Sequence, residues 1–194
     1  MSKLVLLAAV ILICNSCVQK NNKMQDVSQK TLNDSINYVS RALQFIQQVK
    51  QDDLSNGHFI LESQPDAPCS SCFKEALSDI IVFSRQEDQS IRQQASHPYI
   101  RSWTNHLFPG IKIVNSDTIR KIFANRSQGW DYFYQHVGHR ADGFSAPIFF
   151  NSDTYCLFYS SYSCGLLCAY GSLVLYKKEG NHWIEVKSYC EWIS

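Results

Sequence analysis

The chain after residue 30 repeats apolar and polar positions with the period of a helix. Between residues 31 and 50, apolar side chains recur every three or four positions, at Ile36, Val39, Leu43, Ile46 and Val49. This spacing places them on one stripe of an amphipathic helix. Thr31 followed by Asp34 resembles a capping box, with Asp in place of Glu.

Helical spacing recurs further along the chain. The stretch PCSSCFKEALSDIIVFSRQ, residues 68–86, predicts a second helix with Ser70 or Ser71 as its cap. Pro98 favours the start of a third helix, which Pro109 ends. Two short helices are expected over residues 115–123 and 127–137, and extended segments over residues 58–62 and 111–114.

From residue 144 onward the pattern is that of strands. Four runs rich in β-branched and aromatic residues are separated by turn signals: SAPIFF, TYCLFYSSY, SLVLYKK and HWIEVKSYCEW. They predict an antiparallel β-meander of about four strands, with one face partly solvated and the other covered by helices. The expected fold is α+β, a single domain over residues 31–194 in which N-terminal helices pack on a C-terminal sheet.

Composition and charge narrow the class of protein. The chain has 194 residues, of which 45% are hydrophobic and 13% aromatic, enough to bury one sizeable core. The formal net charge is +1, without long runs of like charge. A nucleic-acid partner is therefore not expected.

The N-terminus has the pattern of an export signal. Lys3 precedes an apolar run over residues 4–13, which is too short to span a bilayer but suits a signal-peptide core. Ser16 and Cys17 follow it and resemble the loose cleavage site of Bacteroidota-type lipoproteins. We expect a signal peptide over residues 1–16 and a polar, flexible tether over residues 17–30.

Cys17 is the expected lipidation site, carrying palmitate-like acyl chains that anchor the protein in the membrane. A cleaved signal with an ordinary Cys17, or cleavage before Cys14, are the alternatives. In the resembling lipoproteins, acidic residues after the cysteine direct export to the surface, and residues 18–22 contain none. The expected location is the cell envelope, as an outer-membrane lipoprotein facing the periplasm.

Six further cysteines follow Cys17: Cys69, Cys72, Cys156, Cys164, Cys168 and Cys190. An even number in an oxidising compartment favours disulfides. The meander brings Cys190 to the same end of the sheet as Cys164 and Cys168, so Cys164 pairs with Cys168, or one of them with Cys190. Cys156 lies at the opposite end and is expected to be a buried small hydrophobe.

Cys69 and Cys72 form a CxxC pair at the start of a helix, where backbone amides lower the pKa of a thiol. This favours either a structural disulfide or, as the alternative, a thiol-disulfide enzyme. The preceding LESQPDAP is a loop rather than the core strand typical of such enzymes. A four-cysteine zinc site built from CSSC and CGLLC ranks below both, and no metal or cofactor is expected.

The remaining chemical candidates are histidines and aromatic rings. His136 and His139, with Asp142, could ligate a metal, but histidines near the carbonyls of a helix end are the expected arrangement. Eight aromatic residues lie in the strand region and form either an exposed binding face or a core covered by helices, together with its rim: Tyr155, Tyr159, Tyr162, Tyr170, Tyr176, Trp183, Tyr189 and Trp192.

The last 70 residues resemble a family of Bacteroidota lipoproteins and secreted proteins. The shared pattern is an aromatic-rich strand, a Cys-Gly-x-x-Cys-like turn, a strand ending in Lys-Lys, a Gly-x-x-Trp hairpin and a terminal Trp-x-Ser. GWDYF and FSAPIF upstream also fit. That family has no established activity, so the resemblance implies architecture and location only. The sequence predicts a lipid-anchored binding or structural module without catalysis, whose protein, peptide or glycan partner is open.

Overall fold

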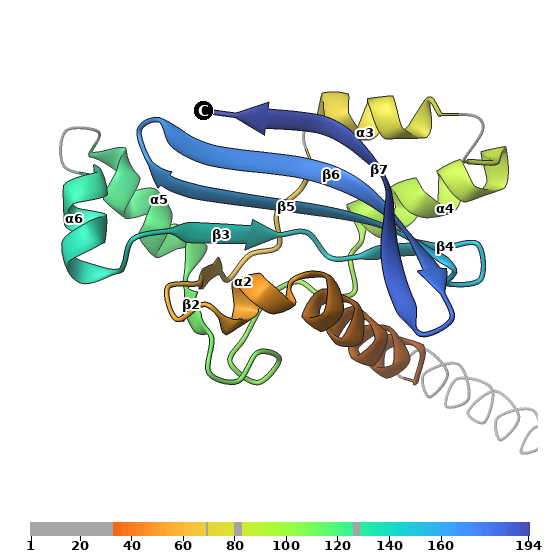
Figure 1. Cartoon of the computed structure of the whole chain (residues 1–194), viewed down its shortest axis with the longest axis horizontal. Coiled ribbons are helices and arrows are strands. Elements are labelled where there is room, and N and C mark those ends of the chain that lie inside the picture. Colours follow the sequence, from red (N-terminus) through yellow and green to blue (C-terminus); the bar gives the residue numbers. More distant parts are fainter. Residues whose placement is uncertain (1–32, 69, 80–82, 126–128) are drawn as a thin grey trace, which may run out of the picture. The chain divides into compact units, whose positions relative to one another are not determined.

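The computed structural model describes residues 33–68, 70–79, 83–125 and 129–194 (Figure 1). The chain divides into two units, of which the first ends at Ser40 and the second comprises residues 41–194. In the first unit, residues 33–40 are helical, and the helix continues to residue 49. The expected signal peptide, the tether, Cys17 and the Thr31 cap all lie outside the described residues.

The helices of the second unit are short. After residue 49 they are α2 (Gln51–Ser55), α3 (Ser70–Leu77), α4 (Arg85–Ser96), α5 (Ser116–Ala124) and α6 (Gly129–His136). The predicted helices at residues 31–50, 68–86, 115–123 and 127–137 are thus confirmed in position, although the second one ends earlier than expected.

The prediction of a helix that begins at Pro98 is wrong. The third helix is instead α4, which ends before Pro98, and residues 97–111 form turns and irregular structure. Ser84 caps α4 in a capping box with Glu87. Because α4 is polar and buries only Ile91, it has no clear apolar stripe, and its cap is the stronger signal.

Seven strands form one mixed sheet. They are β1 (Ile60–Glu62), β2 (Lys112–Val114), β3 (Ala141–Phe144), β4 (Ile148–Phe150), β5 (Tyr155–Gly165), β6 (Cys168–Glu179) and β7 (His182–Ile193). The order is β2-β1-β3-β5-β6-β7, with β4 beside β5. The β1 strand pairs in parallel with β2 and β3, and all the other pairs are antiparallel.

The α+β class is confirmed, and two details of the prediction are wrong. The sheet has seven strands rather than about four, because three short strands join the four of the meander. The helices are not all N-terminal, since α5 and α6 lie between β2 and β3 in the chain. The β3 strand, ADGF, contains two residues that are rare in strands, which explains why its sequence does not reveal it.

Side chains from α3, α4 and the long strands form one core cluster. Cys72 and Ala76 of α3 and Ile91 of α4 pack with Leu157, Leu173, Leu175 and Tyr189. A second group of rings surrounds Phe45, whose ring meets those of Phe149, Phe158, Tyr176 and Trp183 edge-on at centroid distances of 5.2–5.9 Å. Such edge-to-face packing adds to the free energy gained from burial.

Two disulfides are present among the described cysteines. Cys72 of α3 bonds to Cys190 of β7, 118 positions further along the chain, and Cys164 bonds to Cys168 across the β5–β6 turn. Cys156 lies buried with a free thiol. Burial holds the pKa of this thiol well above its usual value, so the thiol stays protonated and unreactive.

Loop length predicts unequal contributions from the two disulfides. In the chain-entropy model, removing the Cys72–Cys190 bond costs about 5 kcal/mol of unfolding free energy, and removing the Cys164–Cys168 bond costs about 2 kcal/mol. Urea unfolding of the C72S/C190S and C164S/C168S double variants measures both values. Equal losses of unfolding free energy would show that strain or residual structure, rather than loop closure, determines how much each disulfide contributes.

Candidate functional site

A pocket of ≈ 470 Å³ opens between the 65–68 loop, α3, α4 and the segment before β4. Its wall is mostly apolar and includes Pro65, Pro68, Phe73, Ala146 and Ile148. Three ionisable side chains interrupt this wall: Asp66, Lys74 of α3 and Arg92 of α4. The pocket therefore combines an apolar body with one acidic and two basic groups.

Asp66 is held in place by both its backbone and its side chain. Its amide donates to the carbonyl oxygen of Phe144 at 2.8 Å, and the Ser161 hydroxyl donates to its Oδ2 at 2.7 Å. The carboxylate lies directly over Gly143 of β3, where any Cβ would collide with Oδ2. Only glycine at position 143 leaves room for this carboxylate.

The Asp66 carboxylate is the end of a polar chain that crosses one face of the sheet. Trp192 donates its indole N–H to the Tyr159 hydroxyl at 3.1 Å. The Tyr159 hydroxyl also interacts with the Ser161 side chain, which in turn donates to Asp66. Gly171 makes the approach of Trp192 possible, because a Cβ there would meet both the indole ring and the Tyr159 oxygen.

Burial shifts the pKa values of the acidic groups in this region. It raises the pKa of Asp66 above its ordinary value, against the opposing effect of the Ser161 hydrogen bond. The pKa of Glu62 is raised as well, first by burial and then by repulsion from Asp66, while Ser116 and Arg120 act to lower it. Both carboxyl groups line a second pocket of ≈ 340 Å³, on whose wall Ser116 and Arg120 also lie. Asp66 thus borders two pockets.

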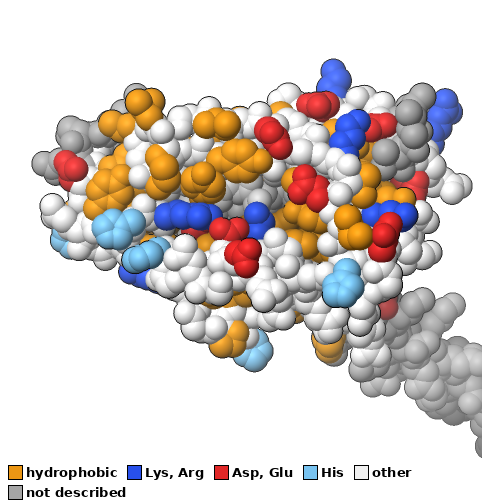
Figure 2. Space-filling model, viewed as in Figure 1, with side chains coloured by type: hydrophobic (Ala, Val, Ile, Leu, Met, Phe, Trp, Pro, Cys, Tyr) orange, Lys and Arg blue, Asp and Glu red, His pale blue; other side chains and the backbone are white. Residues whose placement is uncertain are grey.

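A different acidic group, Asp142 of β3, is buried and 1% exposed. It forms an ion pair with Arg140 and accepts the Ile60 amide at 3.3 Å, while Arg140 also contacts Asp53 at 3.1 Å. The Arg140 guanidinium stacks over the Tyr162 ring, 4.3 Å from its centroid. Figure 2 shows basic and acidic side chains side by side on the face in view, below a group of hydrophobic ones.

Burial is the largest influence on Asp142 and raises its pKa from 3.8 to about 6, although Arg140 opposes the shift and Asp53 adds to it. Asp142 therefore binds its proton more tightly in the folded protein than in the unfolded chain. This group stabilises the fold most below pH 4 and loses that contribution as the pH rises to about 6.

The histidines of the predicted metal candidate do not converge on Asp142. His136 stacks on Tyr132 with a centroid distance of 4.1 Å, and its Nδ1 lies 2.9 Å from the Tyr132 carbonyl oxygen, as expected for a histidine at a helix end. His139 contacts the rings of Tyr134 and His58. Among the residues that the structure describes, no three His, Cys, Asp or Glu side chains gather in a way that could hold a metal ion.

The eight aromatic residues of the strand region lie in the core or at its rim. Tyr159, Tyr176 and Tyr189 are buried, and the others are partly exposed. Of the CxxC pair, Cys72 is fully buried and bonded to Cys190, whereas Cys69 lies outside the described residues. Thiol-disulfide exchange at Cys69 and Cys72 stays a prediction.

The sequence analysis did not predict the Asp66 pocket. Its wall comes from three parts of the chain that are far apart in sequence, residues 65–68 with 70–74, residues 92–98 and residues 145–148. The one local signal is the acidic residue between two prolines in the loop QPDAP.

No protein-family model matches the chain, and neither the curated proteins nor the solved structures contain a match. Within the part of the chain that is described, no helix has both the length and the apolar character needed to cross a bilayer. The candidate site therefore rests on the geometry of this chain alone.

The close approach at Gly143 predicts a specific defect. Gly143→Ala pushes the Asp66 carboxylate off its position and breaks the bond from Ser161, at a cost of about 1–3 kcal/mol. Gly57→Ala is the matched control, because a Cβ there meets nothing within 4 Å. Urea unfolding measures both variants, and an equal stability of the two would contradict the arrangement at Asp66.

The raised pKa of Asp142 predicts a pH-dependent difference in stability. Between pH 4 and pH 6.5 the wild type should lose about 2 kcal/mol of unfolding free energy relative to Asp142→Asn, which cannot ionise. Urea unfolding across this range tests it, with the exposed Asp117→Asn as control. A pH-independent difference between wild type and Asp142→Asn would show that Asp142 has an ordinary pKa.

Proposed function

We propose that this protein is a lipid-anchored protein of the bacterial cell envelope that binds a short peptide or amino-acid derivative in the Asp66 pocket, without catalysing a reaction. The observation that carries the proposal is the pocket itself. Its apolar wall carries one fixed carboxylate and two cations, so it offers partners for both charges of a zwitterionic ligand.

The chemistry of the wall favours a peptide over a sugar. Asp66 can accept from an ammonium or hydroxyl group, and Lys74 and Arg92 can bind a carboxylate. Arg92 is already oriented by Asp88, with its Nε 3.0 Å from the Asp88 carboxylate. Phe73, Ala146 and Ile148 give the apolar side chain of a ligand a surface to cover.

A binding role agrees with the hydrogen bonds at Asp66. The Ser161 hydroxyl donates its hydrogen to Asp66 and is linked through Tyr159 to Trp192, which immobilises the carboxylate. A fixed carboxylate recognises a ligand with little loss of side-chain entropy.

The proposed location rests on the sequence. The apolar run over residues 4–13 and the Ser16-Cys17 pair support export, acylation of Cys17 and anchoring in the outer membrane, facing the periplasm. The two disulfides agree with an oxidising compartment. Mass spectrometry of the mature N-terminus tests the anchor, and a mature chain whose Cys17 is unmodified or missing would contradict it.

Ligand binding can be measured by NMR with N-acetyl amino acids, free dipeptides and disaccharides as probes. We expect free dipeptides with an apolar side chain to shift amide signals of residues 65–74, 92–98 and 145–148. Asp66→Asn should weaken binding at least tenfold, whereas the exposed Asp117→Asn should leave it unchanged. Stronger shifts by disaccharides, or shifts that Asp66→Asn does not affect, would refute the proposed ligand class.

A further inference from the structure

The turn between β5 and β6 presents two leucines almost entirely to solvent. Leu166 is 83% exposed and Leu167 is 89% exposed. The disulfide between Cys164 and Cys168 closes the chain on either side of them. Ile193 of β7, which is 83% exposed, pairs with Tyr170 near the same end of the sheet. We call Leu166, Leu167 and Ile193 the apolar tip.

Most of the hairpin that carries the apolar tip has no charged side chain. Residues 155–176 contain no Asp, Glu, Lys, Arg or His. Tyr162 and Tyr170 face each other across the hairpin, with ring centroids 6.1 Å apart. Leu166 lies four residues beyond Tyr162, no more than about 13 Å at the rise of an extended strand. At a membrane surface, tyrosine rings lie at the level of the lipid head groups while apolar side chains lie deeper. The two leucines at the turn, beyond Tyr162 and Tyr170, have this arrangement.

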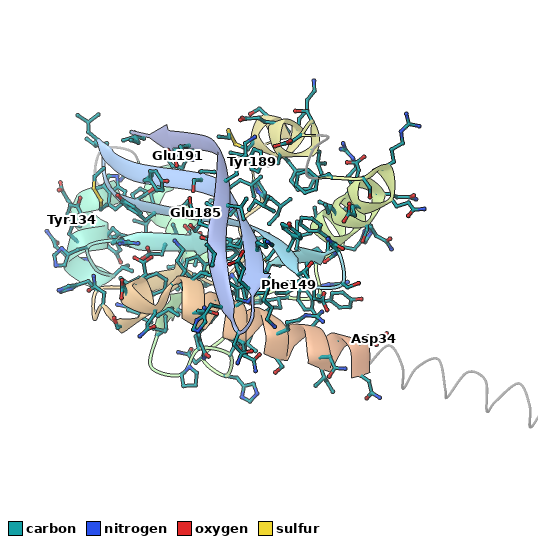
Figure 3. All side chains as sticks on the ribbon, turned by 45° about the vertical axis from the view of Figure 1, so that its right-hand side comes forward. Asp34, Tyr134, Phe149, Glu185, Tyr189 and Glu191 are labelled. Carbon is teal, nitrogen blue, oxygen red and sulfur yellow. A yellow bond between two sulfur atoms is a disulfide. The ribbon has the colours of Figure 1, made fainter. Side chains whose placement is uncertain are left out.

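The backbone on both sides of the turn is hydrogen-bonded within the protein. The Tyr134 hydroxyl donates to the carbonyl oxygen of Cys164 at 2.7 Å, and the Ala169 and Ser194 backbones exchange two hydrogen bonds of 2.9 and 3.1 Å. Figure 3 shows Tyr134 at this end of the molecule, beside the turn. Satisfied backbone groups lower the cost of placing a turn in a lipid phase.

We propose that the apolar tip inserts into the periplasm-facing phospholipid leaflet of the membrane and acts as a second contact with the membrane. The proposal rests on the proposed function in that it assumes a protein held close to a membrane. Three side chains cannot supply the roughly 800 Å² that each partner of a standard protein interface buries. A small, protruding apolar surface can insert into a fluid hydrocarbon layer, but it is too small for a stable interface with a second copy of the chain.

Tryptophan reporters can test the insertion in the full, acylated chain. Leu166→Trp and Leu167→Trp place the reporter in the tip, and Ile184→Trp is the matched control. Ile184 is also exposed, but it pairs with Lys177 towards the other end of the sheet. The protein is reconstituted in vesicles of phosphatidylethanolamine and phosphatidylglycerol with or without brominated acyl chains. We expect brominated lipid to quench the emission added by both tip reporters and to leave that of Ile184→Trp unquenched.

The outcomes separate this proposal from the anchor. A chain that floats with the vesicles while neither tip reporter is quenched overturns the insertion and leaves the anchor intact. If the chain isolated from cells carries no acyl groups and its tip reporters are still quenched, the insertion is supported and the anchor is rejected. A chain that neither floats nor is quenched overturns both. A blue shift that grows with protein concentration without vesicles would show that a second copy covers the tip, which also overturns insertion.

Discussion

The buried carboxylate of Asp142 joins the two halves of the sheet. On one side, β3 pairs in parallel with β1 through a single register pair, Leu61 with Asp142, and on the other side β3 lies antiparallel to β5. Asp142 strengthens the weaker side because its side chain accepts the Ile60 amide of β1. The next two residues serve the pocket: Gly143 leaves room for the Asp66 carboxylate, and the Phe144 carbonyl accepts the Asp66 amide and the Trp103 indole. The geometry of the pocket thus depends on one four-residue strand.

That dependence explains what the sequence can and cannot predict. The long strands β5, β6 and β7 are evident because apolar and aromatic residues repeat along them. The β3 strand has no such pattern, since its place in the sheet depends on tertiary contacts to Asp142 and Gly143 that no local rule describes. The α4 helix was missed for a similar reason, as Ile91 alone is buried. The Asp66 pocket exists only where three distant segments meet, so its residues carry no shared sequence signal.

Each disulfide holds in place one of the two regions for which we propose a function, the Asp66 pocket and the apolar tip. Cys72 belongs to α3, and the next two residues, Phe73 and Lys74, line the pocket, so the bond to Cys190 holds this wall against the last strand. Cys164 and Cys168 flank the two exposed leucines and keep them at the end of the hairpin. Cys156, buried with a free thiol, contributes volume to the core instead. The two bonds therefore preorganise a recessed surface and a protruding one.

The bond between Cys72 and Cys190 also determines how the molecule carries mechanical load. Tension applied between a point before Cys72 and a point after Cys190 passes through the sulfur atoms and not through the intervening chain. Residues 73–189, which include β4, β5, β6, most of β7 and most of the pocket wall, are then shielded from that pull. Stretching the oxidised protein extends only the segments outside this covalent loop, whereas the reduced protein can unravel along its whole length.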